Sequence, residues 1–258
     1  MRVDLRPFAA ALFAILFALP AMAPARAQSF SNEQRSEIER IVRDYLLKNP
    51  ELLQEVMSEL EKRQAAAEAA KHRAAVKEQA ATIFNSARQV NLGNPQGDVT
   101  VVEFFDYNCG YCKRAMADML DLIKGDAKLK YVLKEFPVLG EGSVQAAQVA
   151  VAVRMQDKTG GKKYLEFHQK LLGSRGAADK ARSIAAAKDV GLDIARIEKD
   201  LASEEIKATL EESMKLAEAL GLNGTPSYVI GGDVVIGAVG LKALREKVNE
   251  ARCGKPAC

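Results

Sequence analysis

Hydrophobic residues recur with a helical period in the N-terminal third of the chain. Apolar positions are three and four residues apart in one stretch, and a second stripe with the same spacing follows Asn49-Pro50. Proline separates the two stripes because it disfavours helical geometry in the residue before it. The pattern predicts helix over nearly all of residues 32–88, with Ser31 or Asn32 as the capping residue. The stripe residues are Ile38, Ile41, Val42, Tyr45 and Leu46, followed by Leu52, Leu53, Val56, Met57 and Leu60.

The stretch from Glu61 to Ala81 is rich in Ala, Lys, Glu, Arg and Gln. These residues favour a helix but give it little to bury, which indicates a long exposed connector. The stripes then have two candidate partners: they form a helical hairpin on their own chain, or they pair with the stripes of other copies. We favour self-association, so the sequence predicts a homo-oligomer assembled through residues 29–80, with the number of copies left open.

Beyond residue 83 the pattern changes to short strands that alternate with helices. Runs of β-branched and aromatic residues predict the strands, and turns rich in Gly, Asn and Asp separate them. The predicted strands are 83–92, 99–105, 130–136, 227–230 and 234–236. A helix is predicted from Lys113, successive helical patterns fill residues 143–220, and a last helix covers residues 241–251. This order predicts an α/β domain built on a β-α-β unit, with a helical block before the final hairpin.

The most informative chemical motif begins where the strand at residues 99–105 ends. Cys109-Gly110-Tyr111-Cys112 leads directly into a helix, so both sulfurs fall in the first helical turn. Unpaired backbone N–H groups and the helix dipole stabilise a thiolate there, and the thiolate is the form of cysteine that attacks disulfides or binds metals. The order predicts that Cys109, which is nearer the helix start and more exposed, attacks first and that Cys112 resolves.

The same cysteine pair is also compatible with a structural disulfide or with half of a zinc site. A closed zinc site needs about four ligands, and the chain has only two histidines, His72 and His168, both in charged helical contexts typical of a solvated face. Redox chemistry is therefore favoured, with no metal and no cofactor expected. Cys253 and Cys258 are expected to form a local disulfide, with an accessory redox or Cu(I) site as the alternative.

Residues 1–27 have the composition of a secretory signal peptide. Arg2 and Arg6 precede an uncharged apolar run that is too short to span a bilayer, and Ala25-Arg26-Ala27 supplies small residues for cleavage. We therefore expect an exported protein in a compartment where disulfides persist. Removal of the signal takes away three arginines and one aspartate, which lowers the formal net charge from +3 to +1. No nucleic-acid partner is expected from that charge.

Four elements together resemble the DsbA family, whose members have a thioredoxin fold interrupted by a helical insertion. The elements are the strand with its Cys-Gly-Tyr-Cys turn, Lys134-Glu135-Phe136-Pro137 after the next strand, the helical block, and Gly224-Thr225-Pro226 before a hairpin. The resemblance covers roughly residues 84–252. The implied domains are a signal peptide at 1–27, a helical region at 28–83 that resembles the oligomerising extension of ScsC-type isomerases, and a thioredoxin domain at 84–258 with an insertion near 143–220.

The resemblance also implies roles for four further residues. Thr225 and Pro226 match the cis-proline loop of the family, which faces the cysteine pair and lets the backbone of residue 225 pair with a substrate strand. Glu103 and Lys134 align with a buried charged pair beneath the family's active site, where a carboxylate relays protons to the buried sulfur.

The sequence therefore predicts a periplasmic thiol-disulfide oxidoreductase that acts on unfolded or misbridged proteins and exchanges electrons with a membrane redox partner. The N-terminal stripes, and a Gly-Tyr dipeptide in place of the Pro-His that is typical of DsbA itself, favour an oligomeric isomerase that is kept reduced. A monomeric dithiol oxidase is the first alternative. A copper-binding or structural extracytoplasmic protein, whose cysteines have no redox role, is the second.

Overall fold

The computed structural model describes residues 30–258, and the predicted signal peptide at 1–27 lies outside the described residues. The chain divides into two compact units, Met1–Glu59 and Leu60–Cys258. Within the part of the chain that is described, no helix is both long enough and apolar enough to cross a bilayer.

Two helices carry the N-terminal stripes, as the apolar spacing predicts. Helix α1 spans Asn32–Lys48 and begins with a capping box, in which the side chains of Ser31 and Gln34 each bind the other residue's backbone N–H. Helix α2 spans Glu51–Glu78, so the break falls at Asn49-Pro50. No side chain of α1 is buried, and most of the large apolar residues of both stripes are exposed.

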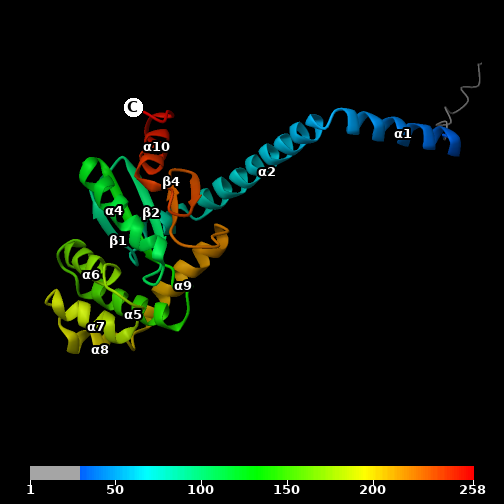
Figure 1. Cartoon of the computed structure of the whole chain (residues 1–258). Helices are drawn as coiled ribbons and strands as arrows, with labels where there is room; N and C mark the ends of the chain where they lie inside the picture. Colours follow the sequence, from blue (N-terminus) through cyan, green and yellow to red (C-terminus); the bar gives the residue numbers. More distant parts are fainter. Residues whose placement is uncertain (1–29) are drawn as a thin grey trace, which may run out of the picture. The chain divides into compact units, whose positions relative to one another are not determined.

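A five-stranded mixed sheet forms the centre of the second unit (Figure 1). Its strand order is β1-β3-β2-β4-β5, with β2 and β3 parallel and every other neighbouring pair antiparallel. The strands are β1 Val90–Gly93, β2 Val99–Phe105, β3 Leu129–Glu135, β4 Ser227–Ile230 and β5 Asp233–Ile236. Strands β2 and β3 are almost wholly buried because helices cover both faces of the sheet, which explains their continuous apolar runs.

The two faces of the sheet pack into separate hydrophobic clusters. On one face, α4 (Gly110–Gly125) and α10 (Gly240–Cys253) contribute residues such as Met119 and Leu244. On the other face, the end of α2 contributes Val76, α3 (Ala80–Asn85) contributes Ile83, and α9 (Glu204–Ala219) contributes Leu216. Alternation along β2 therefore decides which cluster each side chain enters.

The first predicted strand is shorter than the sequence suggested. Residues 83–92 were expected to be a strand, but α3 (Ala80–Asn85) is helical and β1 begins only at Val90. Ile83 is fully buried in the cluster beneath the sheet, and the helical turn is what directs its side chain there. Tertiary packing has overridden the β propensity of a short apolar run.

Five helices lie between β3 and β4 and form the predicted insertion. They are α5 Glu141–Gln156, α6 Lys162–Leu172, α7 Lys180–Asp189, α8 Ile194–Asp200 and α9 Glu204–Ala219. In Figure 1, α5 to α8 form one block, drawn in green to yellow, beside the sheet. Helix α5 is the centre of this block: Ala146, Ala147 and the run 149–153 are all buried. The C-terminal cysteines, Cys253 and Cys258, form the expected local disulfide.

Candidate active site

The cysteine pair lies at the junction of β2 and α4. Cys109 is the N-cap residue of α4 and Cys112 is in its first turn, as the sequence predicts. The two sulfurs are not bridged to each other. The exposed fraction is 6% for Cys109 and 1% for Cys112, so the first sulfur is the more accessible of the two.

The proline loop before β4 faces Cys109. The Thr225-Pro226 peptide bond is cis, as the resemblance implied. The Cys109 thiol donates a hydrogen bond to the carbonyl oxygen of Thr225, with 3.1 Å between sulfur and oxygen. The carbonyl of Pro226 accepts a bond from the backbone N–H of Gly237 at 2.8 Å, which fixes the loop against the residue after β5. The structure thus brings Cys109, Cys112 and Thr225 together.

Burial dominates the electrostatics of Cys112. Removal from water raises the pKa of its thiol well above the usual range, and the nearby Glu103 charge raises that pKa further. A hydrogen bond from the backbone of Asp106 lowers the pKa of Cys112, but by less than burial raises it. Cys112 therefore needs a proton acceptor close by before it can act as a nucleophile.

Glu103 is a buried carboxyl whose charge acts on Cys112 and which could accept its proton. It lies in the middle of β2 with 3% of its surface exposed, and the hydroxyl of Tyr131 donates a hydrogen bond to it at 2.6 Å. Burial raises the pKa of Glu103 to about 7, with the Asp118 charge adding to the rise and the Tyr131 bond opposing it. A carboxyl with this pKa exchanges protons near neutral pH.

Lys134 does not form the predicted pair with Glu103. Strand register aligns Glu103 with Leu133, and Lys134 with Phe104, so the two charged side chains point to opposite faces of the sheet. Lys134 instead donates to the carbonyl of Thr82 at 3.0 Å, and its amine lies 3.8 Å from a carboxylate oxygen of Glu212. Burial lowers its pKa to about 8. The pairing was wrong because a shift of one residue in register turns a side chain to the other face.

The Lys134→Met variant is expected to keep the wild-type rate of disulfide exchange within about twofold. Its unfolding free energy should fall by about 1–3 kcal/mol, because the carbonyl of Thr82 and the carboxylate of Glu212 each lose a partner. Denaturant unfolding and an insulin-reduction assay on the same preparation measure both quantities. A tenfold fall in exchange would instead link this face of the sheet to the chemistry.

Asp106 is a functional candidate that the sequence pattern alone did not single out. Its buried carboxylate accepts hydrogen bonds from the backbone N–H groups of Asn108, Val138 and Leu139 and from the hydroxyl of Ser143, at 2.7 to 3.0 Å. The backbone N–H of Cys109 also donates to the carbonyl of Asp106. An aspartate directly after a strand and before the cysteines was the available signal.

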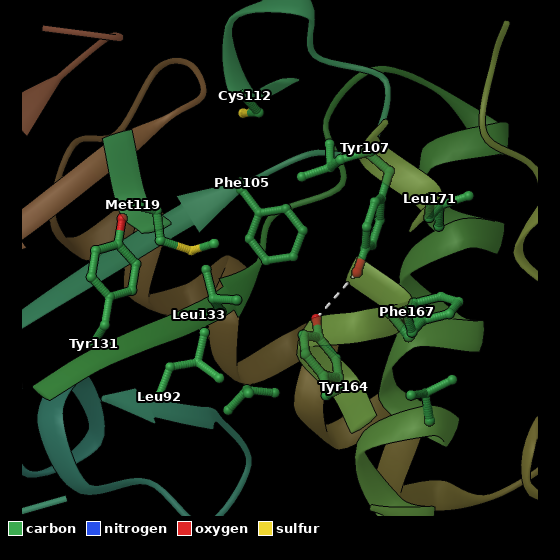
Figure 2. Close-up of a cluster of buried hydrophobic side chains, with 14 of the residues drawn as sticks. Leu92, Phe105, Tyr107, Cys112, Met119, Tyr131, Leu133, Tyr164, Phe167 and Leu171 are labelled. Carbon is green, nitrogen blue, oxygen red and sulfur yellow. Dashed lines mark hydrogen bonds between the residues drawn. The ribbon is translucent and has the colours of Figure 1, made fainter. Parts of the chain in front are cut away.

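His168 is buried rather than solvated, which corrects the sequence-based expectation. Its ring packs against Phe105 and Tyr107, and its Nδ1 lies 3.2 Å from the hydroxyl of Tyr107. Burial lowers the pKa of His168 to about 3, so the ring is neutral at physiological pH. Figure 2 shows the surrounding cluster, in which the hydroxyls of Tyr107 and Tyr164 are joined by a hydrogen bond and Cys112 lies above them.

Metal ligands do not gather in the described part of the chain. Among residues 30–258, no group of three or more His, Cys, Asp or Glu side chains is arranged to hold a metal ion. The tail cysteines, which were the candidate Cu(I) ligands, are bridged to each other in this structure.

Two family profiles match the chain. The profile of the DSBA-like thioredoxin domain matches residues 100–249, more than half of the chain, and that of the copper resistance protein ScsC N-terminal domain matches residues 34–67. The first match contains the cysteine pair and the cis-proline loop. The second covers most of α1 and the first part of α2.

Solved structures resemble the chain over most of their own length. A thioredoxin-like oxidoreductase from Silicibacter pomeroyi is 44% identical, with a TM-score of 0.63 over 67% of this chain and 96% of that one. The thiol-disulfide exchange protein alpha-DsbA2 from Wolbachia pipientis is 31% identical, with a TM-score of 0.66 over 71% and 97%. ScsC from Proteus mirabilis in a transitional conformation is 28% identical, with a TM-score of 0.63 over 88% and 98%.

Two curated relatives match 63% and 59% of this chain. The chain is 27% identical over 162 residues to the Na(+)/H(+) antiporter NhaA 1 of Salinispora arenicola, and it spans only 24% of that protein's length. It is 26% identical over 163 residues to the probable disulfide bond formation protein D of Bacillus cereus, of which it spans 74%. The profile match over residues 100–249 and the 44% identity to the Silicibacter pomeroyi protein show that the chain belongs to the family of the DSBA-like thioredoxin domain.

Proposed function

We propose that the protein exchanges disulfides with other proteins through Cys109 and Cys112. The observation that carries the proposal is the thiol of Cys109 at the start of α4, hydrogen-bonded to the Thr225 carbonyl of the cis-proline loop, with Cys112 buried behind it. The more exposed sulfur, at the helix N-terminus, is suited to nucleophilic attack, and the less exposed one three residues further on is suited to resolution.

The exchange proceeds in two steps. In the reducing direction, the Cys109 thiolate attacks a substrate disulfide, forms a mixed disulfide and releases one substrate thiolate. Cys112 then loses its proton and attacks Cys109, which forms the Cys109–Cys112 disulfide and releases the second substrate thiolate. The protein loses two electrons and the substrate gains them. The oxidising direction is the same sequence reversed.

Glu103 is the proposed proton acceptor for Cys112. Its pKa of about 7 leaves a substantial fraction of the carboxyl ionised at neutral pH, ready to take the proton from the buried thiol. Transfer of the proton also neutralises the charge that raises the pKa of Cys112. The hydroxyl of Tyr131 holds the carboxyl in place.

The Glu103→Gln variant is expected to slow attack by Cys112 about tenfold to a hundredfold at pH 8, because the step loses its general base. The wild-type rate should rise with pH around 7 as Glu103 ionises, and the variant should lack that rise. Stopped-flow resolution of a mixed disulfide formed with a small fluorogenic disulfide measures the step.

The pH dependence of the unfolding free energy is a second test of Glu103→Gln. The folded-state pKa of Glu103 lies above the usual value of 4.5, so the folded protein binds more protons between about pH 4.5 and 7 and its stability falls as pH rises through that range. Glu103→Gln should remove that fall, a difference of about 3 kcal/mol above pH 7. Glu141→Gln, a change at an exposed acid in α5, is the control and should leave both profiles unchanged.

Protein substrates fit the surface around Cys109. The resemblance implies that a substrate strand pairs with the backbone of Thr225, beside the nucleophile. Tyr111, between the two cysteines, keeps 59% of its surface exposed, and the Arg114 guanidinium stacks over its ring at 4.3 Å. An exposed aromatic ring next to the attacking sulfur favours apolar segments, which unfolded or misbridged proteins expose.

An oligomeric isomerase is the preferred mode of action. The exposed stripes of α1 and α2 offer apolar faces for association between copies, and their region matches the ScsC N-terminal domain profile. A monomeric oxidase that is recycled by a membrane partner is the alternative. Export to the periplasm is proposed because residues 1–27 have the composition of a signal peptide. One structural relative is described as a periplasmic thioredoxin-like protein from Salmonella enterica.

Two ribonuclease assays separate the modes. An isomerase in its reduced form restores activity to scrambled ribonuclease, whereas an oxidase in its disulfide form restores activity to reduced ribonuclease. Recovery of the scrambled enzyme, with little recovery of the reduced one, supports the isomerase. Absence of activity in both assays and in insulin reduction contradicts the proposed exchange altogether.

A further inference from the structure

Every residue between the end of β2 and Cys109 is held by its side chain. Asp106 binds the loop after β3 and the first turn of α5. The hydroxyl of Tyr107 lies against Tyr164 and His168 of α6, at 3.3 and 3.2 Å. Asn108 reaches both α5 and the segment before α7. The position of Cys109 therefore depends on the helical insertion as well as on the strand that precedes it.

Asn108 makes the most specific of these contacts. Its side-chain oxygen accepts a hydrogen bond from the backbone N–H of Ala178 at 2.6 Å, and its Nδ2 donates to the carbonyl of the same residue at 2.9 Å. The Nδ2 also donates to the hydroxyl of Ser143 at 2.9 Å. An amide side chain is suited to such two-sided pairing because it presents a donor and an acceptor side by side.

Close packing around Asn108 leaves little freedom for this arrangement. A Cβ added at Gly142, in the first turn of α5, would lie 2.8 Å from the carbonyl oxygen of Ala178 and 3.6 Å from Nδ2 of Asn108. Ala178 itself is 2% exposed. Glycine at position 142 therefore permits the close approach of α5 to the Ala178 segment with which Asn108 pairs.

We propose that Asn108 is a positioning residue that clamps Cys109 to the helical insertion and favours the dithiol state of the cysteine pair. The proposal rests on the proposed redox function of Cys109 and Cys112. In the disulfide state, the bond to Cys112 itself restrains Cys109, and Cys109 has no S–H to donate to Thr225. In the dithiol state its position depends on the clamp, so loss of the clamp destabilises that state more.

The test is the equilibrium of the full-length protein with glutathione. In this reaction the protein disulfide takes two electrons and two protons from two glutathione thiols, which form glutathione disulfide. Asn108→Ala is expected to shift the equilibrium toward the protein disulfide by about threefold to tenfold, because three neutral hydrogen bonds are lost mainly from the dithiol state. The oxidised and reduced fractions are measured by acid quenching and alkylation.

Gln156→Ala is a matched control. The Gln156 side chain pairs in the same two-sided way with the backbone of Asp193, at 2.7 and 3.1 Å, but joins α5 to α8 and touches no residue of the site. It should lower the stability of both redox states alike and leave the glutathione equilibrium within twofold. Gly142→Ala provides a second route, because it displaces Ala178 without altering Asn108, and should shift the equilibrium in the same direction.

The outcomes separate the two proposals. If Asn108→Ala and Gly142→Ala behave like Gln156→Ala in the glutathione equilibrium, the clamp has no redox role and the inference fails. If Asn108→Ala does not fold, Gly142→Ala alone decides. If the wild-type protein exchanges no disulfide with insulin or ribonuclease, the proposed function fails, whereas the clamp is still judged by the glutathione equilibrium.

Discussion

Replacing Cys109 by alanine is expected to abolish disulfide exchange, lowering insulin reduction by about a thousandfold or more to the rate of the uncatalysed reaction. The reason is positional: of the two sulfurs, Cys109 is the more exposed, begins α4 and contacts the cis-proline loop. The thiolate is the attacking species, and no other group at this position can replace it. Turbidity of reduced insulin, followed with dithiothreitol as electron donor, gives the rate.

Cys112→Ala should have a different effect from Cys109→Ala. Without the resolving sulfur, the mixed disulfide between Cys109 and the substrate persists and is visible as a covalent complex on a non-reducing gel. The control removes the tail disulfide through Cys253→Ser with Cys258→Ser, and should retain wild-type exchange. If Cys109→Ala keeps its activity while the tail variant loses it, the reactive cysteines are Cys253 and Cys258, and the proposed site is wrong.

The sequence was sufficient to place the cysteine pair at the start of α4, because each of the signals for that placement is local. A buried strand, a Cys-x-x-Cys turn and a helix follow one another without interruption, so chain order alone places Cys109 at the helix N-terminus. The position of Thr225-Pro226 beside it needed the family resemblance, since no local pattern indicates that residues 109 and 225 meet. The insertion and final hairpin were readable from helical periodicity and turn composition.

The errors concern properties that depend on long-range packing. Periodicity places Lys134 on a strand, but only the register of β3 against β2 shows that it faces away from Glu103. His168 has charged neighbours along its helix, yet α6 turns it toward Phe105 and Tyr107. The bonds of Asn108 to Ala178 join residues 70 positions apart. None of these contacts can be predicted from the local sequence pattern.

The exposed stripes provide the second large expected effect. Ile41 and Tyr45 lie on one face of α1, with 58% and 57% of their surfaces exposed. Burial of each at an interface between copies contributes about 1.5–3 kcal/mol, and an aspartate there would have to be desolvated. Ile41→Asp with Tyr45→Asp is therefore expected to weaken association by at least a hundredfold and to convert the proposed oligomer to monomers. Light scattering during size-exclusion chromatography measures the mass.

The matched control places two aspartates on the opposite face of the same helix. Ser36→Asp with Leu47→Asp introduces the same charges at exposed positions, and Leu47 is itself 70% exposed, so this variant should keep the wild-type mass. A shortened chain that lacks α1 should begin near Leu60, because Val76 is buried in the core beneath the sheet and must be retained.

Activity then distinguishes assembly from chemistry in the stripe variant. Insulin reduction per cysteine pair should stay within about twofold of wild type, since the site contains no residue of α1. Recovery of scrambled ribonuclease should fall at least tenfold, because reshuffling of several bonds in one substrate benefits from several active sites held together. If the wild type, the stripe variant and the control variant all have the mass of a single chain, assembly through α1 is excluded, and the monomeric oxidase becomes the better account of the same cysteine chemistry.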